Sequence, residues 1–180
     1  MKSIYYLTGR GGKLNEGLGE GLLMRGYSVS GREVSHELMG LTFQEQLDLI
    51  SDDLAQFWTP ESKVIAVSYG AYLLLHALIK LDPCPTNTLL ISPILGGVQD
   101  NETMKFYRPP RADELMNKAR TGAFPKPEQL LIHVGEHDWQ SIPKRSLEFT
   151  NAVGGKCIVV PNKGHNLGKD YVSNLLDSWL

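Results

Sequence analysis

The sequence predicts an α/β fold in which helices cover both faces of a parallel sheet. Short apolar runs rich in Val, Ile and Leu alternate with longer stretches of helical spacing from one end of the chain to the other. Several of the apolar runs lack polar alternation, as expected of strands that are buried on both faces. Six strands are therefore expected, at residues 3–8, 27–34, 63–67, 88–92, 129–134 and 156–160.

The first half of the chain supplies two helices with clear ends. In residues 15–25 leucines recur on one side, and Gly26 follows as a residue that readily adopts the left-handed cap conformation. Residues 43–58 carry the clearest apolar stripe, and Thr42 and Glu45 form a capping box at its start. The strand between these helices is the weakest of the six because Gly31 interrupts it.

The second half continues the alternation, with one interruption. Residues 71–81 are apolar nearly all round, which predicts a buried helix, and residues 167–179 form the last helix. Residues 93–127 show neither the hydrophobic pattern of a strand nor that of a helix, apart from a short possible helix at 112–120. A segment this long in a compact domain is usually functional, so a small lid is expected here.

Length, composition and charge indicate one globular domain over residues 1–180. The chain is 42% hydrophobic, and about 70% of the unfolded surface of a chain this long can be buried. Eighteen Lys and Arg against twenty Asp and Glu give a net charge of −2, without the basic face that nucleic acids require. No bilayer-spanning run or signal peptide is evident, so a cytoplasmic protein without a membrane partner is expected.

Cysteines and histidines give no sign of a metal or a disulfide. Cys84 and Cys157 are far apart and are interpreted as reduced packing residues. The five histidines are scattered without metal-ligand spacing, so no metal and no other cofactor is expected.

The sharpest local motif is Ala66-Val67-Ser68-Tyr69-Gly70, where a buried strand passes through Ser68 directly into an apolar helix. Such a turn lifts a serine hydroxyl above the sheet, and it requires small residues two positions before and after the serine. Ala66 and Gly70 meet that requirement, although glycine is usual at both positions. A serine between a strand and a helix is also a common helix cap, and that alternative remains open.

A serine nucleophile needs a base and a group that orients the base, and the chain supplies both after later strands. Asp138 lies in the loop after the fifth strand, and His165 lies in the loop after the sixth. Glu136 is a rival for the orienting carboxylate. His165 could instead be a loop histidine that fixes the last helix.

These motifs, each at the end of a strand and in the order Ser, Asp, His, resemble a compact α/β-hydrolase over almost the whole chain. The resemblance implies a nucleophile at Ser68, a general base at His165 and an orienting carboxylate at Asp138. It implies a three-layer α/β/α arrangement whose six strands have the order 2-1-3-4-5-6. Full-length members usually have two strands before the one expected at residues 3–8.

The resemblance also implies an oxyanion hole, formed by the backbone N–H groups of Tyr69 and Arg10. Arg10 lies in the glycine-rich stretch after the first strand, which is similar to the family's His-Gly-x-Gly loop but has Thr8 in place of the histidine. The same loop could cradle a phosphate, but it lacks the Gly-Lys-Ser/Thr ending of a P-loop.

The expected function is therefore cleavage of a small-molecule carboxylic ester or thioester through an acyl-enzyme on Ser68. The alternative is a non-catalytic module that binds a ligand or protein on the same scaffold. Four residues are candidates for substrate binding: Arg108, Arg111, Tyr107 and Trp139. Oligomeric state is not indicated by the sequence.

Overall fold

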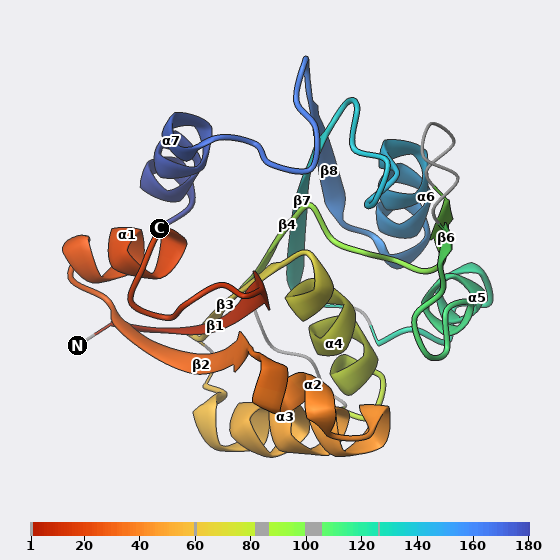
Figure 1. Cartoon of the computed structure of the whole chain (residues 1–180), viewed down its shortest axis with the longest axis horizontal. Helices are drawn as coiled ribbons and strands as arrows, with labels where there is room; N and C mark the ends of the chain where they lie inside the picture. Colours follow the sequence, from red (N-terminus) through yellow and green to blue (C-terminus); the bar gives the residue numbers. More distant parts are fainter. Residues whose placement is uncertain (1, 60, 82–86, 100–105, 126) are drawn as a thin grey trace.

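Six parallel strands form the central sheet of the computed structural model, which describes residues 2–59, 61–81, 87–99, 106–125 and 127–180. The order across the sheet is β2-β1-β3-β4-β7-β8 (Figure 1). The strands are β1 (Ser3–Arg10), β2 (Ser28–Val34), β3 (Lys63–Val67), β4 (Asn87–Ile91), β7 (Gln129–Gly135) and β8 (Lys156–Val160). Since β5 and β6 belong to a separate pair, this is the predicted 2-1-3-4-5-6 order, and the prediction is confirmed.

Helices cover both faces of this sheet (Figure 1). One face carries α1 (Leu18–Met24) and α7 (Lys169–Trp179), whose leucines pack on Ile4, Tyr6 and Ile65. The opposite face carries the larger core. The helices on that side are α2 (His36–Gly40), α3 (Phe43–Phe57), α4 (Tyr69–Leu78), α5 (Glu114–Arg120) and α6 (Pro143–Val153). The three-layer α/β/α arrangement is thus confirmed, with its two sides unequally covered.

Helix α4 is the most deeply buried helix of the larger core. Every residue from Tyr69 to Leu78 is buried, as its nearly all-apolar sequence predicts. Helix α3 packs against it and starts at Thr42, which makes the predicted capping box with Glu45. The residues predicted to end this helix, Asp82-Pro83-Cys84-Pro85, lie outside the described residues. Cys157 is a free, half-buried thiol.

The segment 93–127 contains more order than its sequence predicts. It holds a short antiparallel pair, β5 (Val98–Gln99) and β6 (Phe106–Tyr107), in addition to helix α5. Helices α2 and α6 also lie outside the four main helices that the periodicity predicts. Two of these additions, α2 and the β5–β6 pair, are five residues or fewer per element, which is too short for a periodic signal.

The sequence predicts β2 as the weakest strand because it contains Gly31, yet β2 pairs along most of its length with β1. Close backbone contact at Gly31 explains this. A Cβ at this position would lie 2.0 Å from the carbonyl oxygen of Tyr6, its partner in the ladder, and its φ is +134°. Only glycine allows this close backbone approach without strain.

We expect Gly31→Ala to lower the free energy of unfolding by about 2–4 kcal/mol, because the methyl group enters the β1 backbone in an unfavourable conformation. Urea denaturation followed by circular dichroism measures this. The matched control is Gly40→Ala in α2, where an added Cβ meets open space. Equal stabilities for the two variants would contradict the assigned role of Gly31.

Candidate active site

Ser68 occupies a strained turn between β3 and α4. Its φ and ψ are 52° and −117°, a region that non-glycine residues rarely adopt. Its side chain makes no capping hydrogen bond to the helix. Instead, Ser68 Oγ lies 2.8 Å from His165 Nε2. The structure therefore places this hydroxyl against an imidazole and not at a helix cap.

Close backbone packing explains the small residues around Ser68. A Cβ on Gly70 would lie 2.2 Å from the carbonyl oxygen of Thr8, so α4 can approach the end of β1 only with glycine at this position. Ala66 is fully buried between its ladder partners Leu7 and Leu90. Its methyl group, the departure from the usual glycine, is accommodated in this register.

His165 links the hydroxyl to a carboxylate. Its Nδ1 lies 3.0 Å from Oδ1 and 2.9 Å from Oδ2 of Asp138. Glu136, the sequence rival for this position, is directed elsewhere: its Oε2 accepts a hydrogen bond from the backbone N–H of Asn162 at 2.9 Å, and its side chain is half exposed. The three residues predicted from the motif order thus form one continuous chain of contacts.

Asp138 is almost completely buried, with 2% of its surface exposed. Burial alone would raise its pKa, but hydrogen bonds from His165 and from the backbone N–H of Ser141 lower the pKa below the usual value. The backbone N–H of Gln140 donates to the same carboxylate oxygen at 3.0 Å. The carboxylate is therefore held as an anion facing the imidazole.

Backbone contacts bring the Asp138 and His165 loops together. A Cβ on Gly135 would lie 2.1 Å from the carbonyl oxygen of Gly164, so this glycine permits direct contact between the loops. The backbone N–H of His137 donates to Lys163 O at 2.8 Å. Ser92, the residue directly after β4, donates a hydrogen bond from its Oγ to the carbonyl oxygen of His165 at 2.9 Å.

The structure extends β1 to Arg10, two residues beyond the predicted strand end, so the glycine-rich stretch begins within the end of β1, and it lies beside Ser68. A Cβ on Gly9 would be 3.5 Å from Ser68 Cβ, an ordinary contact distance. Tyr69 is the first residue of α4, so its N–H has no partner within the helix. Gly11 donates its N–H to Val34 on β2.

Comparison with solved structures identifies the fold, whereas no protein-family model and no curated sequence matches the chain. The ydeN gene product from B. subtilis matches with a TM-score of 0.69 at 14% identity, over 99% of this chain and 98% of that one. Paleococcus ferrophilus monoacylglycerol lipase matches with a TM-score of 0.63 at 12% identity, over 98% and 93%. The chain has a compact α/β-hydrolase fold. An uncharacterized protein from Bacillus cereus ATCC 10987 also matches (TM-score 0.65, 14% identity), and this chain, matched over 98% of its length, spans 57% of that one.

The α/β-hydrolase fold places Ser68 and His165 in the wall of a cavity of about 1030 Å³. Tyr107 and Trp139, both predicted to bind substrate, also line it. The side chain of Arg10 extends over it, stacked 4.4 Å from the Tyr69 ring centre and hydrogen-bonded to the hydroxyl of Tyr107. This contact connects Tyr107 on β6 to Arg10 at the end of β1.

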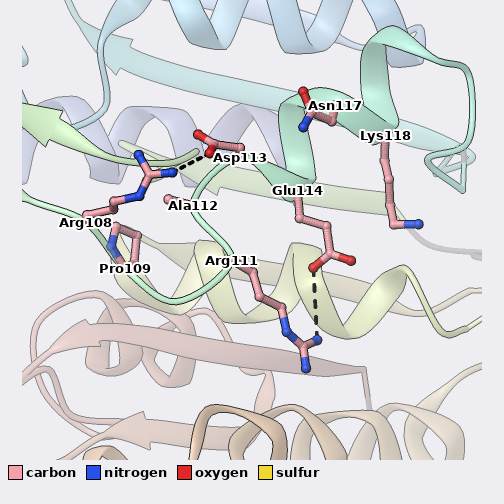
Figure 2. Close-up of a pocket in the computed structure, with 8 residues that line it drawn as sticks. All are labelled: Arg108, Pro109, Arg111, Ala112, Asp113, Glu114, Asn117 and Lys118. Atoms are coloured by element: carbon pink, nitrogen blue, oxygen red, sulfur yellow. Dashed lines mark hydrogen bonds and ion pairs between the residues drawn. The ribbon is translucent and has the colours of Figure 1, made fainter.

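Arg108 and Arg111, the other two predicted substrate-binding residues, are not among the described residues that line this cavity. They border a separate surface depression of about 620 Å³ next to α5 (Figure 2). There Arg108 pairs with Asp113, and Arg111 lies 4.0 Å from Glu114. Each of these two arginines therefore has a carboxylate partner within the same depression.

Sequence reasoning did not assign roles to Ser92, Ser141 and Gly135. Ser141 Oγ lies 3.4 Å from His165 Nδ1, and Ser92 adopts a positive φ of 46° at the end of β4. Their signal was position at the edge that carries the site: Gly135 ends β7, Ser92 directly follows β4, and Ser141 lies in the segment between β7 and α6. In the described part of the chain, no group of His, Cys, Asp or Glu could hold a metal ion, and no helix is long and apolar enough to cross a bilayer.

The lowered pKa of Asp138 gives a pH-dependent stability. Its folded-state pKa lies below the unfolded value of about 3.9, so its contacts stabilise the protein above that value and are lost as pH falls through the folded-state pKa. We therefore expect the free energy of unfolding of the wild type to exceed that of Asp138→Asn by an amount that shrinks as the pH is lowered from about 5.

Urea denaturation at a series of pH values between about 5 and 3 tests this expectation. Glu136→Gln is the matched control, since this carboxylate lies in the same loop but is half exposed, and a smaller effect is expected from it. A difference for Asp138→Asn that grows toward acid would contradict the assignment.

Proposed function

We propose that the protein is a serine hydrolase that cleaves a carboxylic ester or thioester through an acyl-enzyme on Ser68. The observation that carries this proposal is the chain of contacts from Ser68 through His165 to Asp138 in the wall of one cavity. Ser68 is the nucleophile, His165 the base and Asp138 the orienting carboxylate.

In the acylation step, Ser68 Oγ attacks the substrate carbonyl carbon while His165 Nε2 takes the hydroxyl proton. The 2.8 Å separation between these atoms is within hydrogen-bond reach. Asp138 accepts a hydrogen bond from Nδ1–H of His165, which holds the imidazole in the tautomer whose Nε2 is unprotonated and able to act as a base, and it stabilises the imidazolium that forms. His165 then gives its proton to the departing alcohol or thiol.

The tetrahedral intermediate carries a negative charge on the former carbonyl oxygen. Tyr69 and Arg10 supply the backbone N–H donors for this oxyanion, and the N-terminal end of α4 adds its dipole. Losing one such donor typically costs about 10²- to 10³-fold in rate. In deacylation, His165 activates a water molecule that attacks the acyl carbon, and Ser68 leaves with the proton.

The segment 93–127 acts as a small lid over this chemistry. It borders the cavity through Ile94, Val98 and Tyr107, and the Tyr107 hydroxyl contacts Arg10 on the opposite rim. The lipase among the structural neighbours supports an ester substrate.

We expect Ser68→Ala to abolish labelling by a fluorophosphonate probe and to lower kcat/KM for p-nitrophenyl esters by at least about 10³-fold, because the nucleophile is removed. Asp138→Asn should lower kcat by a similar order while retaining some labelling. Gel fluorescence and absorbance at the nitrophenolate band measure the two quantities.

Ser178→Ala is the matched control, since Ser178 is exposed on α7 and its hydroxyl donates to Leu175 O, away from the cavity. It should label and turn over as the wild type does. Equal labelling of Ser68→Ala and wild type would refute the nucleophile. No labelling and no turnover of any ester by wild type would favour the non-catalytic binding module.

A further inference from the structure

The cavity that holds Ser68 extends away from the reacting atoms into a groove between α1 and α7. We call this extension the α1/α7 groove. Its floor is Tyr6 on β1, and its two walls come from helices that are far apart in sequence (Figure 1). The residues that define it are Tyr6, Leu18, Gly21, Met24, Val172 and Leu176.

The groove exists because α1 carries glycine where it faces α7. A Cβ on Gly21 would be 3.4 Å from Arg25 Nη1 and 3.8 Å from Leu176 Cδ1 on α7, so a larger side chain at this position would enter the groove between these two groups. Gly19 has a different role, since its Cβ would lie 2.0 Å from the carbonyl oxygen of Leu14 and close packing requires its absence. Gly21 therefore leaves volume open, while Gly19 allows contact.

Arg25 lines the cavity together with two other charged residues of the same helices, Glu20 and Lys169, and its own contacts are internal. It donates to Asp177 Oδ1, to Ser173 Oγ and to the carbonyl oxygen of Gly21. These bonds tie the end of α1 to α7 and neutralise the guanidinium. The groove is therefore mostly apolar along its length and offers no unpaired charge at Arg25 to an anionic ligand.

The length of the groove sets a scale for its occupant. Along α7 the lining runs from Lys169 to Leu176, which spans about 10 Å at the helical rise per residue. An extended hydrocarbon chain covers this distance with roughly eight carbons, because each bond of about 1.5 Å advances a zigzag chain by somewhat less than its own length. The groove and Ser68 share one cavity, so a chain lying there can be attached directly to the reacting carbonyl.

We propose that the substrate carries one extended, uncharged hydrocarbon chain of medium length, roughly eight carbons, which lies in the α1/α7 groove. This inference rests on the proposed serine hydrolase function and names its substrate class. Burying each further methylene in the groove is worth about a four-fold gain in kcat/KM, up to the length at which the groove is filled.

The first experiment compares p-nitrophenyl esters from acetate to dodecanoate. We expect kcat/KM to rise by at least about 10²-fold from acetate to octanoate and to stop rising beyond it. Octyl acetate against ethyl acetate forms a second arm, which reports whether the chain belongs to the acyl or to the alcohol part. Flat profiles in both arms would overturn the proposal while leaving the hydrolase function intact.

The second experiment fills the groove. Gly21→Leu places an isobutyl group against Leu176 and should lower the ratio of octanoate to acetate kcat/KM at least about ten-fold. Gly40→Leu, a glycine in α2 with open space on the other side of the sheet, should leave the ratio unchanged. Circular dichroism and thermal unfolding confirm that both variants are folded.

A binding measurement makes the groove testable without turnover. Ser68→Ala should be stabilised against heat by p-nitrophenyl octanoate more than by p-nitrophenyl acetate, and Gly21→Leu added to Ser68→Ala should remove the difference. Equal shifts for both esters in Ser68→Ala would overturn the groove assignment. Octanoate-selective binding with no turnover in wild type would support the groove and refute the hydrolase.

Discussion

Backbone-to-backbone contact at the carboxyl edge of the sheet is the constraint on which the site depends. Two glycines permit it: Gly70 lets α4 reach the end of β1, and Gly135 lets the Asp138 loop touch the His165 loop. A single methyl group at either position would collide with a carbonyl oxygen. These contacts bring together the loops that carry the 2.8 Å and 2.9 Å separations from Ser68 through His165 to Asp138.

The hydrogen bonds of the sheet hold two strained residues in place at the edge that carries the site. Ser68 and Ser92 both adopt positive φ values directly after buried strands, and each strained residue costs on the order of 1–3 kcal/mol. Parallel ladders on both sides of β3 and β4 fix the chain up to the strained position, so the turn has little freedom to relax. Asp138 is stabilised differently, because its burial is offset by donors from Ser141 and His165.

The sequence predicted the sheet from strong local signals, whereas it predicted that Ser68, Asp138 and His165 lie together only from the order of three motifs that are each weak alone. Buried parallel strands read as continuous apolar runs, so even the bounds Lys63–Val67 and Lys156–Val160 were correct. The position of Arg108 could not be predicted in the same way. Its partner Asp113 lies five residues away, within the same insertion, and no local pattern reports the direction in which such an insertion folds back. The α1/α7 groove could not be predicted from the sequence either, because its shape depends on how two helices that are far apart in sequence pack next to each other.

Helix α1 shows that this volume is maintained at the expense of helix stability. It has seven residues, of which Gly19 and Gly21 are glycine, and each glycine in a helix interior costs about 1 kcal/mol relative to alanine. Close packing accounts for Gly19, but an ordinary side-chain contact distance would be available at Gly21. The bonds from Arg25 to α7 then hold a helix that its own sequence favours weakly. In the described part of the chain, α1 and α7 are the helices that cover this face of the sheet, and α1 has no side chain at Gly21. These two features are therefore the physical origin of an apolar space that opens onto Ser68.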